Sequence, residues 1–242
     1  MRRAKMATLP KSLSPRATGQ QVYEDLHGQI VRGQLRPGDS LTETRIGEAY
    51  GLSRTPVREV FWRLGEEGFL RVIPQVGTFV APINIPAVYD AQFVRETLEC
   101  RAVADAAAAA SPTDIIVLRQ LLQQQREAVA IGDFARFFAQ DEQMHRQLML
   151  LAGRPFVWQV ITSAKAQLDR VRFLSLEQGT WPGMILDQHA QIIDCVAAHD
   201  AAGAVAIMTA HLRTAFAAIE RIAAENPHFF EGALPDSARK HA

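Results

Sequence analysis

The chain has little cysteine and no long apolar run, and both absences narrow its class. Only two of its 242 residues are cysteines, Cys100 and Cys195, and they lie far apart. We interpret them as small buried hydrophobic residues of a reducing cytoplasm, with a disulfide as the alternative. No segment approaches about eighteen uninterrupted apolar residues, so no transmembrane helix and no membrane partner are expected. The basic N-terminus lacks the apolar run of a secretory signal.

Net charge is absent as well, because 26 Lys and Arg residues balance 26 Asp and Glu residues. The balance hides an asymmetry between the two parts of the chain. Residues 1–80 hold 12 basic and 8 acidic residues, whereas residues 81–242 hold 14 and 18. A basic front and an acidic rear indicate that one domain contacts phosphate and the other has a different task.

The segment from Ser53 to Val60 reads SRTPVREV and follows a short helix that ends at Gly51. Ser53 is expected to cap a new helix, with Pro56 in the first turn, where its missing N–H costs nothing. Arg54 and Arg58 are four residues apart and therefore leave one face of that helix near its N-terminus. This is the arrangement of a helix-turn-helix, whose second helix enters the DNA major groove.

The front of the chain predicts a winged helix-turn-helix over residues 19–81. Residues 1–18 contain five basic residues, no acid and two prolines, and are predicted to form a flexible basic arm. Apolar spacing predicts three helices, and two short strands follow around the turn Pro74–Gly77, which makes a small β-hairpin wing. The expected elements are helices 19–33, 43–50 and 55–67 and strands 69–73 and 78–81.

The rear of the chain has no strand pattern and predicts an all-helical domain over residues 88–228. A linker covers residues 82–87, and residues 229–242 are predicted to form a polar tail. The fold class is therefore mainly α, with an antiparallel six-helix bundle behind the winged domain. Prolines near the helix starts and glycines near the boundaries predict helices at 88–109, 112–131, 133–151, 155–176, 182–199 and 201–225.

Four polar side chains fall on inward faces of this bundle. Asp141 and His145 share the apolar face of one predicted helix, and His189 and His211 lie within the apolar stripes of two others. A buried polar group costs free energy unless it is compensated. One such residue alone is read as a hydrogen-bonded core residue, but four together predict a shared divalent cation with open coordination positions.

The front motifs resemble the DNA-binding domain of the GntR family of bacterial transcription regulators. The resemblance rests on Gly38-Asp39, on the run Gly51–Glu59, and on Leu64, Gly68, Gly77 and Val80. It implies that Arg54, Thr55 and Arg58 contact operator DNA and that Gly77, at the wing tip, approaches the minor groove. Thr44 occupies a position where many relatives carry a DNA-contacting arginine.

The rear motifs resemble the FCD effector domain found in the FadR-like branch of that family. They are Asp141-x-x-x-His145, His189, and His211 followed by Leu212-Arg213. The resemblance implies that the four residues bind a divalent metal, often zinc or nickel, and that a small carboxylate effector completes the coordination. Arg95 matches an arginine on the first bundle helix, where it would bind that carboxylate. The alternative for Arg95 is a salt bridge to Glu99.

The leading hypothesis is therefore a metabolite-responsive regulator of the cytoplasm, a repressor that binds a pseudo-palindromic operator as a homodimer. A small organic acid would bind in the helical domain and shift DNA affinity. One alternative keeps the regulator and makes the metal purely structural. The other is a metal-dependent enzyme that acts on a small acid, although no general base is evident beside the four residues.

Overall fold

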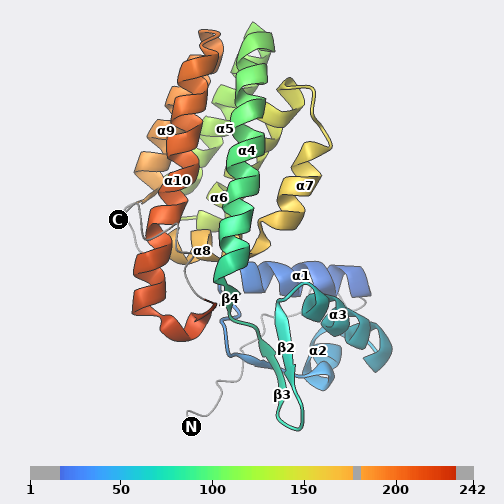
Figure 1. The fold of residues 1–242 in the computed structure, drawn as a ribbon. Helices are drawn as coiled ribbons and strands as arrows, with labels where there is room; N and C mark the ends of the chain where they lie inside the picture. Colours follow the sequence, from blue (N-terminus) through green and yellow to red (C-terminus); the bar gives the residue numbers. More distant parts are fainter. Residues whose placement is uncertain (1–16, 177–180, 233–242) are drawn as a thin grey trace. The chain divides into compact units, whose positions relative to one another are not determined.

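The computed structural model describes residues 17–176 and 181–232. These residues divide into two compact units (Figure 1). The first contains the chain up to Ile85 together with the segment from Ala223 onward, and the second contains Pro86–Ile222. Within the described ranges, no helix is both long and apolar enough to cross a membrane. The predicted basic arm lies outside the described residues except for Ala17 and Thr18.

The first unit is built on three helices, α1 (Gly19–Val31), α2 (Glu43–Tyr50) and α3 (Arg54–Glu66). Thr18 caps α1 through a reciprocal capping box with Gln21. Gly51 ends α2 with a φ of 66°, a left-handed conformation that glycine adopts without a steric penalty. Ser53 occupies the N-cap position of α3, but its side chain makes no capping hydrogen bond, so that detail of the prediction is wrong.

A three-stranded antiparallel sheet completes the winged domain, in the order β1-β3-β2. The strands β2 (Leu70–Ile73) and β3 (Gly77–Val80) form the predicted hairpin. The sequence did not predict β1 (Ser40–Leu41), which pairs with β3 and fixes the chain between α1 and α2 to the wing. The observed fold confirms the winged helix-turn-helix.

The predicted linker and tail are partly regular structure. Strand β4 (Ile83–Asn84) pairs in parallel with β5 (Phe230–Glu231), which follows the 3₁₀ helix Pro227–Phe229. Ile83 and Phe229 are buried. Glu231 also forms an ion pair with Arg71 of β2. The described end of the chain is thus held by backbone hydrogen bonds, apolar burial and a charge pair, and is not a free tail.

The second unit is a helical bundle in which Figure 1 shows the long helices α4 and α10 running along each other. Polar contacts between these two helices include Cys100 with Thr209 and Glu96 with Arg213. The described part of this bundle has seven helices and not six, because the fourth predicted helix is divided at Lys165. The helices are α4 (Ile85–Ala109), α5 (Pro112–Ala130), α6 (Phe134–Leu151), α7 (Val157–Ala164), α8 (Ala166–Leu176), α9 (Trp181–Ala197) and α10 (Ala201–Glu225).

An apolar core drawn from α4, α5, α6, α9 and α10 fills one part of this bundle. Its members include Val103, Leu118, Leu148, Ile193 and Met208, all almost completely buried. Their burial removes large apolar surfaces from water, which is the main stabilising contribution to such a bundle. This packing fixes α6, α9 and α10 against each other and thereby positions the polar side chains that project from their inner faces.

Candidate metal centre and nucleic-acid interface

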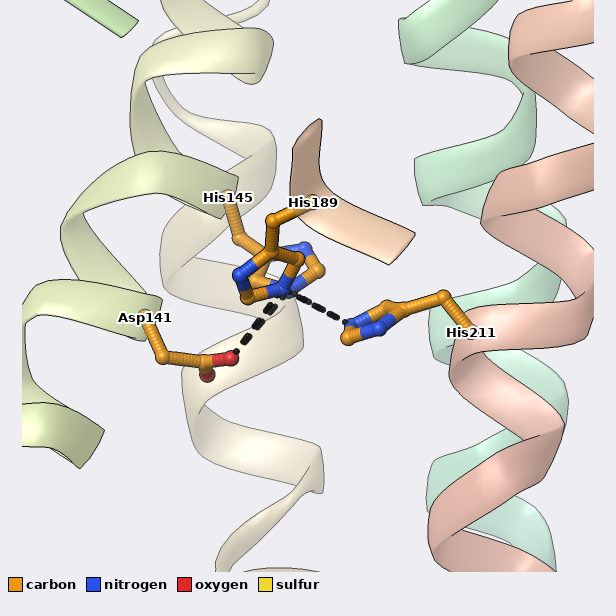
Figure 2. Close-up of side chains that lie close together, drawn as sticks. All are labelled: Asp141, His145, His189 and His211. Carbon is orange, nitrogen blue, oxygen red and sulfur yellow. Dashed lines mark hydrogen bonds and ion pairs between the residues drawn. The ribbon is translucent and has the colours of Figure 1, made fainter. Parts of the chain in front are cut away.

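The four predicted ligands meet inside the helical unit. Asp141 and His145 project from α6, His189 from α9 and His211 from α10, and Figure 2 shows them converging on one point. One ligand atom of each side chain lies within 4.8 Å of those of all the others. The Nε2 atom of His211 is 3.1 Å from Nε2 of His145 and 3.4 Å from Nε2 of His189. All four residues are buried.

An oxygen atom also lies close to the other ring nitrogen of each imidazole. Oε2 of Glu99 lies 2.5 Å from Nδ1 of His145. Oε1 of Gln125 lies 2.6 Å from Nδ1 of His189, and Oε1 of Gln188 lies 3.2 Å from Nδ1 of His211. Such outer partners fix the tautomer and the ring orientation of metal-binding histidines.

The orientations of the two glutamine amides are set independently of the histidines. Nε2 of Gln125 donates to the carbonyl oxygen of Gln140, and Nε2 of Gln188 donates to Oγ1 of Thr214. The amide oxygens therefore face the rings and accept hydrogen bonds from Nδ1. Consequently the Nε2 atoms of His189 and His211 carry lone pairs, and these lone pairs point into the cluster.

The protonation states of these side chains are those that metal ligands need. Burial lowers the pKa of His189 to about 3 and also lowers the pKa of His211, so both rings are neutral at neutral pH. Burial opposes ionisation of Asp141, but the charge of the nearby Arg172 holds the pKa of Asp141 well below its usual range. Burial also opposes ionisation of Glu99, but Arg95 and His145 outweigh this effect and lower the pKa of Glu99 to about 2. The cluster thus offers the neutral imidazoles of His189 and His211 and the carboxylate of Asp141.

This donor set fits a divalent cation. The Nε2 lone pairs of His189 and His211, whose nitrogens lie 3.4 Å apart, repel each other unless a positive charge lies between them. Oδ1 of Asp141, which faces the same point, is buried and has no hydrogen-bond partner among the described residues. Three imidazoles and one carboxylate are ligands that zinc and nickel accept. The residues that would hold the ion are Asp141, His145, His189 and His211.

A second group of buried charges adjoins the cluster. Nη2 of Arg172 on α8 lies 2.5 Å from Oδ2 of Asp141, and its Nη1 lies 3.3 Å from Oδ1 of Asp169. Lys165, at the division between α7 and α8, pairs with Asp169 and places its Nζ 2.5 Å from Oε1 of Glu142. Burial and the charge of Asp169 raise the pKa of Glu142. Arg172 therefore connects the candidate metal centre to a network of ion pairs.

Arg95 lies beside the cluster but is engaged by Glu99. Its Nε donates to Oε1 of Glu99 over 2.6 Å, and both side chains are almost fully buried. The geometry thus contains the salt bridge that was the alternative for this arginine. A role in binding an effector stays a prediction, and Arg172 is the second arginine in reach of the ligand set.

The predicted DNA-contacting residues lie on the surface of the winged domain. Arg54, Thr55 and Arg58 are all exposed on α3, with Arg54 and Arg58 one turn apart. Thr44 is exposed on α2, and Gly77 is exposed at the start of β3 with a φ of 144°. The core of the domain lies behind α3, where Val57, Val60, Phe61 and Leu64 are buried. The three residues on α3 can therefore approach a DNA groove together.

Several side chains around the candidate metal centre had little or no sequence pattern that would predict their role. Gln125 and Gln188 lie on helices of ordinary amphipathic pattern, and nothing in that pattern distinguishes them from other glutamines. In the sequence, Lys165 and Asp169 cannot be distinguished from solvent-exposed charges on one long helix. Glu99 had a usable signal, since it follows Arg95 by one helical turn on a face that also carries Ala102 and Val103.

The burial of the histidines predicts a pH dependence of stability. Between a pKa of about 3 in the folded state and about 6.5 in the unfolded state, His189 binds a proton only when the chain unfolds. The free energy of unfolding of metal-stripped protein should therefore fall on acidification below pH 6.5, by about 1.4 kcal/mol per pH unit for each such histidine. Urea unfolding at pH 7.5 and 5.5 measures this. Equal values at the two pH values would contradict the buried neutral state.

The outer partner of His145 provides a second prediction. Replacing Glu99 by Gln keeps the shape of the side chain but removes the charge that stabilises and orients the imidazole. We expect zinc affinity to fall by about 10–100-fold, the range typical of outer-shell changes. Competition with a chromogenic chelator measures the affinity, and Glu127→Gln on the exposed side of α5 is the control. An unchanged affinity would show that Glu99 serves Arg95 alone.

The sequence matches two family descriptions that divide the chain as the structure does. Residues 18–80 match bacterial regulatory proteins of the gntR family, and residues 90–214 match the FCD domain. Two relatives extend over nearly the whole chain. One, from Streptomyces ambofaciens, is an uncharacterized HTH-type transcriptional regulator in an unstable DNA locus, with 37% identity over 89% of this chain and 90% of the relative. The other is the HTH-type transcriptional repressor RspR of Escherichia coli K12, with 32% identity over 92% of this chain and 98% of the relative.

Solved structures agree on the fold. Escherichia coli McbR/YncC superposes with a TM-score of 0.70 at 22% identity, over 87% of this chain and 99% of that one. A GntR regulator from Rhodococcus sp. RHA1 superposes with a TM-score of 0.69 at 24% identity, over 84% of this chain and 97% of that chain. The family consists of DNA-binding transcription regulators and not enzymes, so the enzyme alternative is set aside. The chain therefore belongs to the GntR family of bacterial transcription regulators, with an FCD domain that follows its winged helix-turn-helix in the sequence.

Proposed function

We propose that this regulator is a dimeric repressor whose helical domain senses a small organic acid with the help of a bound divalent metal. Asp141, His145, His189 and His211 hold the ion, and Arg95 and Arg172 neutralise the effector's carboxylate. When bound, the ion supplies a Lewis-acidic position that a carboxylate oxygen can share. The observation that carries the proposal is the convergence of four ligand atoms at one buried point, among them a carboxylate oxygen with no hydrogen-bond partner in the described part of the chain.

The charges connected to this point support an anionic effector. Asp141 is the single carboxylate among the four proposed ligands. A divalent cation held by one carboxylate and three neutral imidazoles would leave one positive charge at the centre. Because an uncompensated buried charge is costly, the metal-loaded centre favours a monoanion such as a small carboxylate.

Repression and dimerisation are proposed on separate grounds. The relative RspR bears the name of a repressor. A single helix-turn-helix contacts one half-site, and two copies placed about one DNA turn apart read a pseudo-palindrome. Sedimentation of the purified protein should therefore give twice the mass of the chain. A monomer that binds operator with full affinity would contradict this part of the proposal.

The proposal is tested by thermal unfolding against a panel of small mono-, hydroxy- and dicarboxylates, each with and without zinc or nickel. A ligand at about 100 times its Kd stabilises the folded state by about 2.7 kcal/mol, which raises Tm by several degrees. We expect at least one acid to raise Tm only when metal is present, and to lose this effect in His189→Ala. The same acid should change DNA affinity.

Two other outcomes would redirect the assignment. If metal raises Tm but no acid adds to it, the metal is structural and the acid-sensing part of the proposal is wrong. If an acid raises Tm equally in metal-stripped protein and in His189→Ala, the effector binds without the metal. His228→Ala is the matched control, because His228 is exposed and lies outside the cluster.

A further inference from the structure

An exposed tryptophan stands on the helix that presents the DNA-contacting arginines. Trp62 of α3 is 68% exposed, although tryptophan is among the largest apolar side chains. Apolar residues of the same helix are buried in the core of the winged domain. An aromatic ring in water at this place is typical of a contact surface, because tryptophan is enriched at interfaces.

Helix geometry places Trp62 on the same side of α3 as the predicted DNA contacts. At 3.6 residues per turn, Trp62 points about 40° from Arg58 and about 20° from Thr55 around the axis. The buried Val57 and Leu64 point to the opposite side. At a rise of about 1.5 Å per residue, Trp62 lies about 6 Å beyond Arg58 and about 12 Å beyond Arg54 along the axis.

We infer that Trp62 contacts DNA, at the sugar-phosphate wall of the groove that receives the N-terminal turns of α3. The major groove is about 12 Å wide, so a helix with Arg54 over the base edges brings Trp62 to its rim. There the ring covers a deoxyribose, and the indole N–H donates to a phosphate oxygen. The inference rests on DNA binding by α3 and adds to it a contact that carries no charge.

The test compares the wild type with Trp62→Ala, Trp62→Phe and Arg58→Ala. The probes are a duplex enriched by the protein from a random-sequence library and an unrelated duplex of equal length. Loss of an uncharged backbone contact should weaken binding to both duplexes by about tenfold and leave the salt dependence unchanged. Arg58→Ala should mainly reduce the preference for the enriched duplex. Indole fluorescence of the wild type should change on binding, and this change should be absent in Trp62→Phe.

Each other result has a definite meaning. If Trp62→Ala binds both duplexes as the wild type does, and Trp62→Phe shows the wild-type fluorescence change, Trp62 does not touch DNA. If the variant instead alters the sedimentation mass, the ring belongs to a protein interface and the inference is wrong. If the wild type enriches no duplex at all, DNA binding by α3 itself has failed, which is distinguishable from failure at Trp62. Circular dichroism of each variant confirms that it is folded.

Discussion

Replacing His211 by Ala is expected to lower the affinity of the protein for zinc by more than about a hundredfold. His211 projects from α10, and its Nε2 lies 3.1 Å from Nε2 of His145 and 3.4 Å from Nε2 of His189. Loss of a direct ligand should exceed the 10–100-fold loss that follows from removing an outer partner. Chelator competition measures the affinity, and nickel provides a second probe with the same ligand preference.

The same substitution should also remove the stabilisation that zinc provides. In the wild type, binding to the folded state raises Tm by mass action, whereas His211→Ala should show little change at the same zinc concentration. His228→Ala should behave like the wild type in both measurements, because this exposed histidine is not part of the cluster. If His211→Ala retains wild-type zinc affinity, the metal binds elsewhere and the candidate centre is wrong.

Replacing Arg58 by Ala is expected to reduce affinity for the selected operator by about 10–100-fold and to relax base preference at one position of each half-site. A good bidentate contact from arginine to guanine contributes about 1–3 kcal/mol of discrimination against the wrong base. Arg58 is exposed on α3, one turn from Arg54, and its loss leaves the core of the domain unchanged. Electrophoretic mobility shift at fixed salt, with single-base operator variants, measures both quantities.

The control for this prediction is Arg119→Ala, which removes the same charge from an exposed surface of the helical unit. Operator affinity should then change little, because only the general electrostatic attraction is affected. Arg54→Ala should resemble Arg58→Ala, but with relaxed preference at a different base. If Arg58→Ala and Arg119→Ala weaken binding equally, without a change in base preference, α3 does not read bases through Arg58.

The ligands of the candidate metal centre could be predicted from sequence because they follow helical periodicity. Asp141 and His145 are one turn apart on a face that periodicity marks as buried, and His189 and His211 interrupt apolar stripes in the same way. Gln125 and Gln188 could not be predicted, since their role depends on which turn of α5 or α9 packs against which imidazole. That register is a property of three-dimensional packing between residues distant in sequence.

The differences between the predicted and observed helices and strands also arise from packing between residues that are distant in sequence. Residues 157–176 contain neither proline nor glycine, so no local signal marks the division of α7 from α8. At that point the buried ammonium of Lys165 pairs with Asp169, four residues on, and with Glu142 of α6, and the second pair is a tertiary contact. Strand β5 is two residues long and exists through its pairing with β4. Propensity within a short window cannot predict pairing between such distant segments.

The pairing of β4 with β5 has a consequence for dividing the protein into fragments. Cleavage at the boundary near residue 85 would give an N-terminal piece that retains the whole helix-turn-helix and wing but lacks β5. Its β4 would then expose unpaired backbone groups and the apolar side chain of Ile83, features that promote edge-to-edge association. The complete DNA-binding module is therefore discontinuous in sequence. A soluble version needs residues 227–232 supplied through a short connection, or as a peptide in trans.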